Sequence, residues 1–267
     1  MSLPNLTKEL IYTYENGVAT LALNRPEKLN ACTTSMYDGI ARVAEEVRDN
    51  DEIKVLIITG VGKGFCSGSD AEERLAARKK VQSRSRKELI HPLGYSAIPL
   101  YTLSKPTIAA INGICVGSGL SIALLCDIRI ASDRARFGAL WIKRGLIPDL
   151  GATYLLPQTV GLDRALELAI TGDLVDAHRA EEMGLVTRVV PHDVLMDAAN
   201  ELARKIASGP SVAVELTKRG MYRGLTSDYA SQLDFETYAQ NMCFQTEDFK
   251  ESIVAFREKR KPRFQGK

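Results

Sequence analysis

The stretch from Thr107 to Cys126, TIAAINGICVGSGLSIALLC, constrains the fold more than any other part of the chain. It opens with a β-branched, apolar run directly after Pro106, which is the pattern of a buried strand. Small residues at Asn112-Gly113 and Gly117-Ser118-Gly119 interrupt it before a second apolar run, which is either helix or buried strand. A small-residue turn lets a ligand approach the backbone, and free N–H groups at a helix start attract anions. The stretch is therefore either an oxyanion or phosphate site or a tight packing turn.

The rest of the chain alternates between strand-like and helix-like segments up to about residue 190. Asn16-Gly17 lies between two β-like runs and predicts a hairpin. The predicted strands are 10–14, 18–23, 55–59, 107–111, 127–131 and 188–190, and the predicted helices are 34–47, 72–80, 162–170 and 177–183. From 194 to 261 the pattern is helical, with breaks at Gly209-Pro210 and from Gly220 to Gly224. This order predicts an α/β core followed by an all-helical C-terminal part.

A second small-residue turn, FCSGSD (65–70), leads into segments with a weaker pattern. The run from Arg74 to Lys87 is strongly basic, which fits either a solvated helix face or a site for a phosphate-bearing ligand. The region 83–104 is predicted to be helical, with breaks at Pro92 to Gly94 and at Pro99.

The composition narrows the class of protein. The 267 residues carry a net charge of +2, so bulk charge gives no case for a nucleic-acid partner or a membrane surface. Three histidines without an HxxxH spacing argue against a dedicated metal site. Five cysteines without a CxxC pair indicate reduced, packed thiols. The sequence shows no signal-peptide pattern and no unbroken bilayer-spanning stretch, and we expect a soluble cytoplasmic protein.

Several motifs, spread in order along nearly the whole chain, resemble those of the enoyl-CoA hydratase/isomerase (crotonase) superfamily. They are LNRPEKLNA (23–31), GFCSGSD (64–70), KPTIAAINGICVGSGLSIALLCDIRIAS (105–132), GLIPDLGATYLLPQTVG (145–161), AEEMGLVTRVV (180–190) and FREKRKP (256–262). The resemblance implies an α/β fold: a spiral of ββα units over residues 4–195 and a helical C-terminal oligomerisation region over 196–267. It implies a homotrimer or a dimer of trimers. It also implies an acyl-CoA thioester as substrate, with coenzyme A as part of that substrate and no separate cofactor.

The resemblance further implies an oxyanion hole made by two backbone amides, which match Ser69 and Ser118 here. Two preorganised N–H donors stabilise the charge that develops on the carbonyl oxygen of a thioester enolate. Removing one such donor costs about 3–4 kcal/mol in other enzymes. Backbone donors need no particular side chain, but position 118 is usually glycine in the family, so the Cβ of Ser118 narrows the site. Gly68, Asp70 and Gly117 flank the two donors and are assigned to substrate binding.

Two positions depart from the pattern of the hydratases in this superfamily. Hydratases place and activate water with two glutamates, and the matching residues here are Ser121 and Trp141. Hydration needs one group that takes a proton from water and another that delivers a proton to the α-carbon. Serine and tryptophan do neither near neutral pH, which disfavours a two-glutamate hydratase. Both residues are still expected at the substrate site.

Asp149, in GLIPDLG, is a carboxylate at a position that carries catalysis in some relatives. In the superfamily an acid at the matching position shuttles a proton in dienoyl-CoA isomerases and in isomerases of aromatic-acid breakdown. One carboxylate suffices for double-bond migration when an oxyanion hole holds the dienolate. We therefore expect an enoyl-CoA isomerase of fatty-acid or aromatic-acid metabolism. The expected apolar neighbours of Asp149 are Trp141, Leu146, Ile147 and Leu150. The alternative role of Asp149 is an N-cap for the helix that begins near Gly151.

Other readings of the same residues stay open. Trp141 and Asp149 match the spacing in the 4-chlorobenzoyl-CoA dehalogenase of the superfamily, where the aspartate attacks an aromatic ring. That reaction also needs a histidine, and His91 lies in the relevant region without aligning to it. A hydratase-type lyase that uses Asp149 with another acid is a further alternative. Loss of both glutamates also fits a non-catalytic relative that binds acyl-CoA or RNA, although the low net charge argues against RNA.

The resemblance also assigns contacts to coenzyme A. The backbone of Lys28, Leu29 and Ala31 matches the segment that contacts the nucleotide. Phe256 and Lys259 match an aromatic residue and a lysine that an adjacent subunit contributes from its last helix. The alternative roles are helix packing for Phe256 and a solvated charge for Lys259.

Overall fold

The computed structural model describes residue 3, residues 6–79 and residues 93–267. The predictions made for 80–92, including the end of the basic run and the place of His91, lie outside the described residues.

A six-stranded sheet forms the base of the fold, in the order β1-β2-β3-β5-β7-β10. Strands β1 (Leu10–Glu15) and β2 (Val18–Leu23) form the predicted antiparallel hairpin, and the other neighbours pair in parallel. The other strands are β3 (Val55–Gly60), β5 (Thr107–Ile111), β7 (Ile128–Ser132) and β10 (Arg188–Val190). Every side chain of Thr107–Ile111 is buried, so the predicted buried strand is confirmed.

A second sheet has four short strands in the order β4-β6-β8-β9. These are β4 (Gly64–Cys66), β6 (Ile114–Val116), β8 (Arg136–Gly138) and β9 (Leu174–Asp176). The chain alternates between the sheets: β3 is followed by β4 and helix α2, and β5 by β6 and helix α5. Each such turn has the predicted ββα form. Strands of three residues carry too little periodicity to be recognised, and the sequence analysis predicted none of these four.

Helices cover both faces of the six-stranded sheet. Along β3, Leu56 and Ile58 pack in the larger core with α1 (Thr34–Asp49), whereas Val55 and Ile57 pack in a separate core with α9 (Leu195–Ala207). Burial of alternate residues on opposite faces explains why this strand reads as a continuous apolar run. Short 3-10 helices are η1 (Pro26–Lys28), η2 (Leu93–Ala97), η3 (Leu140–Arg144) and η4 (His192–Val194).

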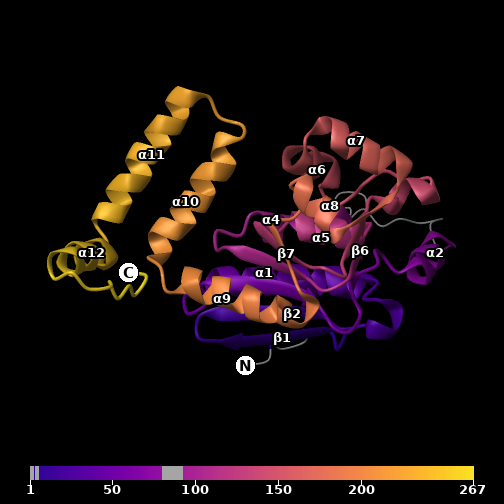
Figure 1. Ribbon diagram of the computed structural model, residues 1–267, viewed down its shortest axis with the longest axis horizontal. Coiled ribbons are helices and arrows are strands. Elements are labelled where there is room, and N and C mark those ends of the chain that lie inside the picture. Colours follow the sequence, from indigo (N-terminus) through magenta and orange to yellow (C-terminus); the bar gives the residue numbers. More distant parts are fainter. Residues whose placement is uncertain (1–2, 4–5, 80–92) are drawn as a thin grey trace.

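The helices α2 (Ala71–Lys79), α4 (Ile98–Tyr101), α5 (Ser118–Leu124), α6 (Ala152–Val160), α7 (Leu162–Thr171) and α8 (Ala177–Glu182) follow the spiral. Figure 1 shows α6, α7 and α8 grouped above the sheets, with α2 at one end of the molecule. The predicted break at Pro99 is wrong, because a proline in the first turn of α4 leaves no hydrogen bond unmade.

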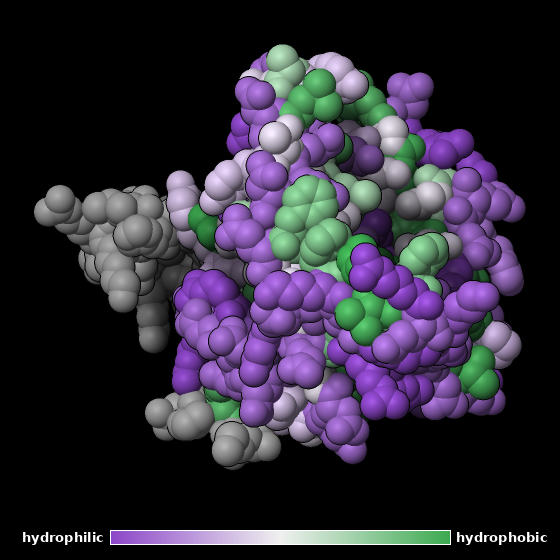
Figure 2. Space-filling view, turned by 90° about the vertical axis from the view of Figure 1, so that its left-hand side faces the viewer, coloured by the Kyte–Doolittle hydropathy of each residue, from purple (hydrophilic) through white to green (hydrophobic). Residues whose placement is uncertain are grey.

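The three last helices, α10 (Ser211–Gly224), α11 (Tyr229–Phe244) and α12 (Glu247–Arg257), project from the core at the end opposite α2 (Figure 1). The all-helical C-terminal part is thus confirmed, and the break predicted from Gly220 to Gly224 lies slightly later, between the end of α10 at Gly224 and the start of α11 at Tyr229. Helix α10 continues through Gly220, whose lack of a side chain leaves room for the ring of Phe235 on α11. The face shown in Figure 2 carries hydrophobic patches among hydrophilic side chains. No helix in the described ranges is both long and apolar enough to cross a membrane.

Candidate active site

The two small-residue turns meet where the second sheet gives way to helices. Gly68 (φ 103°) follows β4 and Gly117 (φ 55°) follows β6, and both have positive φ angles that favour glycine. A Cβ added to Gly68 would lie 3.4 Å from the Val116 carbonyl oxygen and 3.8 Å from the Ser118 nitrogen. The turns therefore approach each other backbone to backbone, and they bring Ser69 and Ser118 together.

The backbone amides around this meeting point are mostly in use. The amide of Asp70 donates to Cys32 (2.8 Å), that of Gly117 to Gly138 (3.1 Å) and that of Ser121 to Gly117 (3.1 Å). Within the described part of the chain, the amides of Ser69 and Ser118 donate to no protein acceptor. Two rigidly held, unused N–H groups at adjoining turns are the arrangement that an oxyanion hole requires.

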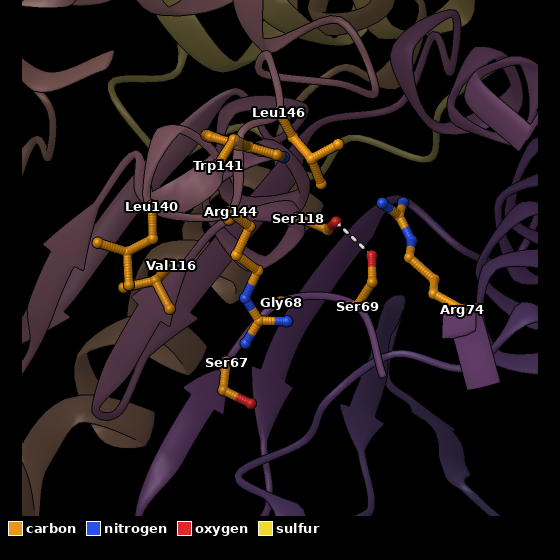
Figure 3. Close-up of a pocket in the computed structure, with 11 residues that line it drawn as sticks. Ser67, Gly68, Ser69, Arg74, Val116, Ser118, Leu140, Trp141, Arg144 and Leu146 are labelled. Atoms are coloured by element: carbon orange, nitrogen blue, oxygen red, sulfur yellow. Dashed lines mark hydrogen bonds between the residues drawn. The ribbon is translucent and has the colours of Figure 1, made fainter. Parts of the chain in front are cut away.

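A pocket of about 90 Å³ that opens to solvent adjoins these amides. Its walls are Ser67, Gly68, Ser69, Arg74, Val116, Gly117, Ser118, Leu140, Trp141, Arg144 and Leu146. Figure 3 shows Ser69 and Ser118 pointing toward each other, with Arg74 on one side and Trp141 and Leu146 above. None of these lining residues is acidic. The carboxylate of Asp149 is held beside the pocket by two of them.

Each oxygen of the Asp149 carboxylate accepts a hydrogen bond from the pocket wall. The indole Nε1 of Trp141 donates to Oδ1 (3.0 Å), and the guanidinium Nη2 of Arg74 donates to Oδ2 (3.0 Å). The Asp149 side chain keeps 31% of its surface exposed, so an acceptor position remains accessible. Two donors fix the direction of the carboxylate, and one of them carries a full positive charge.

Helix α5 holds the loop around Asp149 in place through a hydrogen bond. Ser121, fully buried on α5, donates its hydroxyl to the Asp149 carbonyl oxygen (2.9 Å), which also accepts the Ala152 amide (3.0 Å). The N-cap of α6 is Gly151, with no side-chain cap, so the alternative of Asp149 as an N-cap is wrong. Leu150 adopts a positive φ of 51°, which a buried leucine tolerates only when its surroundings hold it.

Of the apolar neighbours predicted for Asp149, Trp141 and Leu150 are buried and Leu146 packs on the core. Ile147 is 78% exposed and the prediction is wrong for it, because the loop turns this side chain outward. A second, largely apolar cavity of about 10 Å³, room for little more than one water molecule, lies against Leu150. Its walls are Tyr37, Ile40, Ser96, Ala97, Leu100, Ile122, Leu125 and Leu150.

The sequence analysis missed Tyr37, which connects the two cavities. Its phenol lies 2.7 Å from Ser69 Oγ, which in turn lies 2.8 Å from Ser118 Oγ. On an amphipathic helix such as α1, a tyrosine in the apolar stripe is read as a core residue. The analysis also missed Arg144, whose side chain lies over Ser67 in Figure 3.

Known proteins resemble this chain along nearly its whole length. The family model described as enoyl-CoA hydratase/isomerase matches residues 13–267. The chain belongs to the enoyl-CoA hydratase/isomerase family. It is 38% identical over 256 residues to the 1,2-epoxyphenylacetyl-CoA isomerase of Escherichia coli (strain K12), covering 95% of this chain and 97% of that protein. It is 39% identical over 254 residues to the short-chain-enoyl-CoA hydratase of Clostridium acetobutylicum, covering 94% and 95% respectively.

Solved structures agree with this crotonase-type assignment. The fold superposes on the crystal structure of enoyl-CoA hydratase from Bacillus anthracis with a TM-score of 0.89 and 32% identity, covering 97% of this chain and 100% of that one. The chain is therefore an acyl-CoA enzyme of the enoyl-CoA hydratase/isomerase family. Because relatives are named for both reactions, the family does not by itself determine which reaction this enzyme catalyses.

In this enoyl-CoA hydratase/isomerase, the segment predicted to contact coenzyme A lies beside the first turn. The carbonyls of Lys28 and Leu29 accept bonds from the hydroxyl and the amide of Ser67 (3.0 and 2.9 Å), a pocket residue. The Ala31 carbonyl accepts a bond from Arg25 (2.6 Å). Hydrogen bonds thus tie this segment to the wall of the pocket.

Asp70 is buried and holds structure together around the same segment. It accepts the amides of Glu72 and Glu73 at the start of α2 (3.0 and 3.1 Å) and pairs with Arg25 (2.9 Å) and Lys28 (3.4 Å). Burial by itself raises the pKa of Asp70, but the Glu73 amide and the Arg25 guanidinium outweigh it and lower the pKa to about 2. These contacts use its carboxylate within the protein.

Phe256 and Lys259 lie far from the pocket of their own chain. Phe256 is on α12, at the end of the molecule opposite α2, and its ring is 85% exposed (Figure 1). The structure therefore does not bring these two residues to the site within one chain. All five cysteines are free thiols, and four of them are buried.

Proposed function

We propose that this enzyme isomerises the double bond of an enoyl-CoA thioester, with Asp149 as the proton carrier and the amides of Ser69 and Ser118 as the oxyanion hole. The observation that supports the proposal most is the pair of hydrogen bonds that Trp141 and Arg74 donate to the Asp149 carboxylate beside the pocket. A loop aspartate held by two donors from the pocket wall is placed for chemistry on a ligand in that pocket.

One carboxylate accounts for every proton and electron pair in this reaction. Asp149 removes a proton from the α-carbon of a 3-enoyl thioester, and the C–H electrons form a double bond between the α-carbon and the carbonyl carbon as the carbonyl oxygen becomes negative. The amides of Ser69 and Ser118 stabilise that dienolate oxygen. The carbonyl then re-forms, the α,β double bond forms as the β,γ double bond is lost, and the γ-carbon takes the proton back from Asp149. Since protonation of Asp149 leaves Arg74 without its counter-ion, the ion pair favours return of the proton.

Among the described residues that line the pocket none is acidic, so Asp149 beside it has no second acid there, and this supports isomerisation over hydration. Ser121 and Trp141, at the two positions where hydratases have glutamates, are both hydrogen-bonded to Asp149 rather than available for a water. Arg144 and Lys28 would attract the phosphates of coenzyme A.

We also propose that the protein assembles as a homotrimer or a dimer of trimers. Helices α10 to α12 expose large apolar side chains, among them Met221, Tyr229, Tyr238, Phe244 and Phe256. Exposed apolar surface on projecting helices favours association between copies. Such an assembly would bring Phe256 and Lys259 of one copy to the coenzyme A of another. Sedimentation of the purified chain tests it, and a monomer at micromolar concentration would contradict it.

The test of the reaction uses proton exchange in deuterated water. We expect the enzyme to convert trans-3-hexenoyl-CoA to the 2-enoyl isomer and to incorporate deuterium, with no gain of a water in product mass. Asp149→Asn should abolish both conversion and exchange while thioester binding persists, because the amide keeps the size of the side chain but not its basicity.

Each other candidate function has its own outcome in the same assay. Product that gains one water identifies a hydratase. Binding without conversion across 2-enoyl, 3-enoyl and cyclic acyl-CoAs identifies a non-catalytic relative, and halide release from an aryl-CoA identifies a dehalogenase. Full exchange by Asp149→Asn would refute the role of Asp149.

A further inference from the structure

Helix α7 carries an apolar stripe on its outer side. Leu162, Leu166 and Ile170 follow one another at four-residue intervals, which places them along one side of the helix. They are 62%, 47% and 64% exposed. Another side of α7 already supplies Ala165 and Leu168 to the core. An amphipathic helix normally exposes polar residues on the side away from the core, so a continuous apolar stripe there indicates a contact with a partner.

A groove of about 810 Å³ lies between α10 and α11. Leu216, Met221, Phe235 and Phe244 are the larger apolar side chains of its walls. Figure 1 shows α7 and the pair α10 and α11 on the same side of the sheets but apart from each other. Since the stripe of α7 is exposed, it does not occupy the groove of its own chain. One chain therefore presents an apolar stripe and an apolar groove on separate surfaces.

Charged side chains flank both surfaces at the same spacing. Asp163 and Glu167 are exposed beside the stripe, and Arg219 and Arg223 are exposed beside the groove. Each pair is four residues apart on a helix, about 6 Å along the axis. Both guanidinium groups lie over the ring of Phe235, 5.9 and 5.6 Å from its centroid. Within the ranges that the structure describes, none of these four charges forms an ion pair.

We propose that α7 of one copy packs into the groove between α10 and α11 of a second copy, with Asp163 and Glu167 opposite Arg219 and Arg223. An apolar stripe meets an apolar groove, and two acids meet two arginines at the same spacing. Because the two surfaces differ, the contact is head-to-tail, and each copy keeps one surface free until a ring closes. This inference rests on the proposed assembly, and it names the contact that builds the trimer.

Reversal of the charges tests this contact by sedimentation velocity at micromolar concentration. Asp163→Lys with Glu167→Lys puts like charges opposite each other, so we expect about 100-fold weaker association and a monomer in place of the trimer. Arg219→Glu with Arg223→Glu should have the same effect. All four substitutions in one chain restore opposite charges at every contact and should restore the trimer, which damage to the fold would not allow.

Helix α9 offers a matched control. Asp197 and Glu201 are also exposed acids four residues apart, and Asp197→Lys with Glu201→Lys should leave the trimer unchanged. Leu166→Ser tests the apolar part of the contact without a change of charge, and it should weaken association about tenfold. Far-UV circular dichroism of each variant establishes that its helices are intact.

The outcomes separate this inference from the proposals on which it rests. Sedimentation needs no turnover, so the result does not depend on the reaction assigned to Asp149. A monomeric wild-type protein refutes the assembly, and the inference with it. A trimer that survives either charge reversal refutes the contact while the assembly stands. A chain with all four substitutions that stays monomeric refutes the pairing of the charges.

Discussion

Replacing Asp70 with asparagine would remove a buried charge while keeping the shape of the side chain. The carboxylate caps the start of α2 through the amides of Glu72 and Glu73, and it pairs with Arg25 and Lys28. Asparagine is also a good helix cap, so the capping bonds survive the substitution. What is lost is the negative charge between two cations, which the pH dependence of stability can isolate.

The size of this loss follows from the lowered pKa. Asp70 titrates at about 2 in the folded protein, against an ordinary value of 3.8. A tenfold difference in proton affinity is worth about 1.4 kcal/mol, so the ionised form contributes about 2 kcal/mol to stability. Because the folded pKa is the lower one, this contribution is complete above about pH 4 and is lost as the pH falls toward 2.

Urea unfolding of both proteins between pH 2 and 7, at one fixed protein concentration, measures this contribution. We expect Asp70→Asn to be about 2 kcal/mol less stable at pH 7 and equal to the wild type near pH 2. As a control, Asp173→Asn should change stability by less than about 0.5 kcal/mol, because the Asp173 side chain is 74% exposed. A loss that is the same at pH 2 and pH 7 would refute the reasoning, since it would show a steric effect instead of a lost charge.

Three further substitutions test the setting of Asp149. Trp141→Phe removes a hydrogen bond to a charged acceptor, so turnover of trans-3-hexenoyl-CoA should fall about 10- to 100-fold while its binding, measured by calorimetry, changes little. Ser121→Ala should cost about 1 kcal/mol in urea unfolding and slow turnover less than tenfold, because the Ala152 amide still holds the Asp149 carbonyl. Arg74→Gln should change the stability by less than about 1 kcal/mol, since the ion pair is about a third exposed, yet it should slow deuterium exchange. Unchanged exchange rates in all three would mean that Asp149 is not the proton carrier.

Much of the fold could be predicted from the sequence, because its signals are local. The Asn16-Gly17 turn, with positive φ at both residues, is the type that joins two strands of a hairpin. The apolar run of β3 and the amphipathic pattern of α1 follow from burial on both faces and on one face respectively. The four short strands were not found individually, because their pairing depends on partners far away in the chain.

The candidate site likewise has some features that could be predicted from the sequence and others that could not. The turns at Gly68 and Gly117 were recognisable because positive φ and close backbone approach demand small residues in a local pattern. The contacts of Asp149 could not be predicted, since its partner Arg74 is 75 residues away in the sequence. Tyr37 is likewise 32 residues from Ser69, and a hydroxyl on an apolar helix face gives no sign of its partner. The positions of Phe256 and Lys259 depend on a neighbouring copy, which no pattern within one chain reveals.

The two departures from the hydratase pattern are better understood together than as separate losses. Ser121 donates to the carbonyl of Asp149, and Trp141 donates to its carboxylate, so both positions now support the same residue. A glutamate at either place would replace a donor with a group that is an acceptor when ionised, and would put a second negative charge beside Asp149. A single substitution to glutamate at either place would therefore not create a hydratase, because it would first remove a hydrogen bond that holds Asp149. This mutual dependence gives a physical reason why serine and tryptophan occur together with an aspartate at position 149.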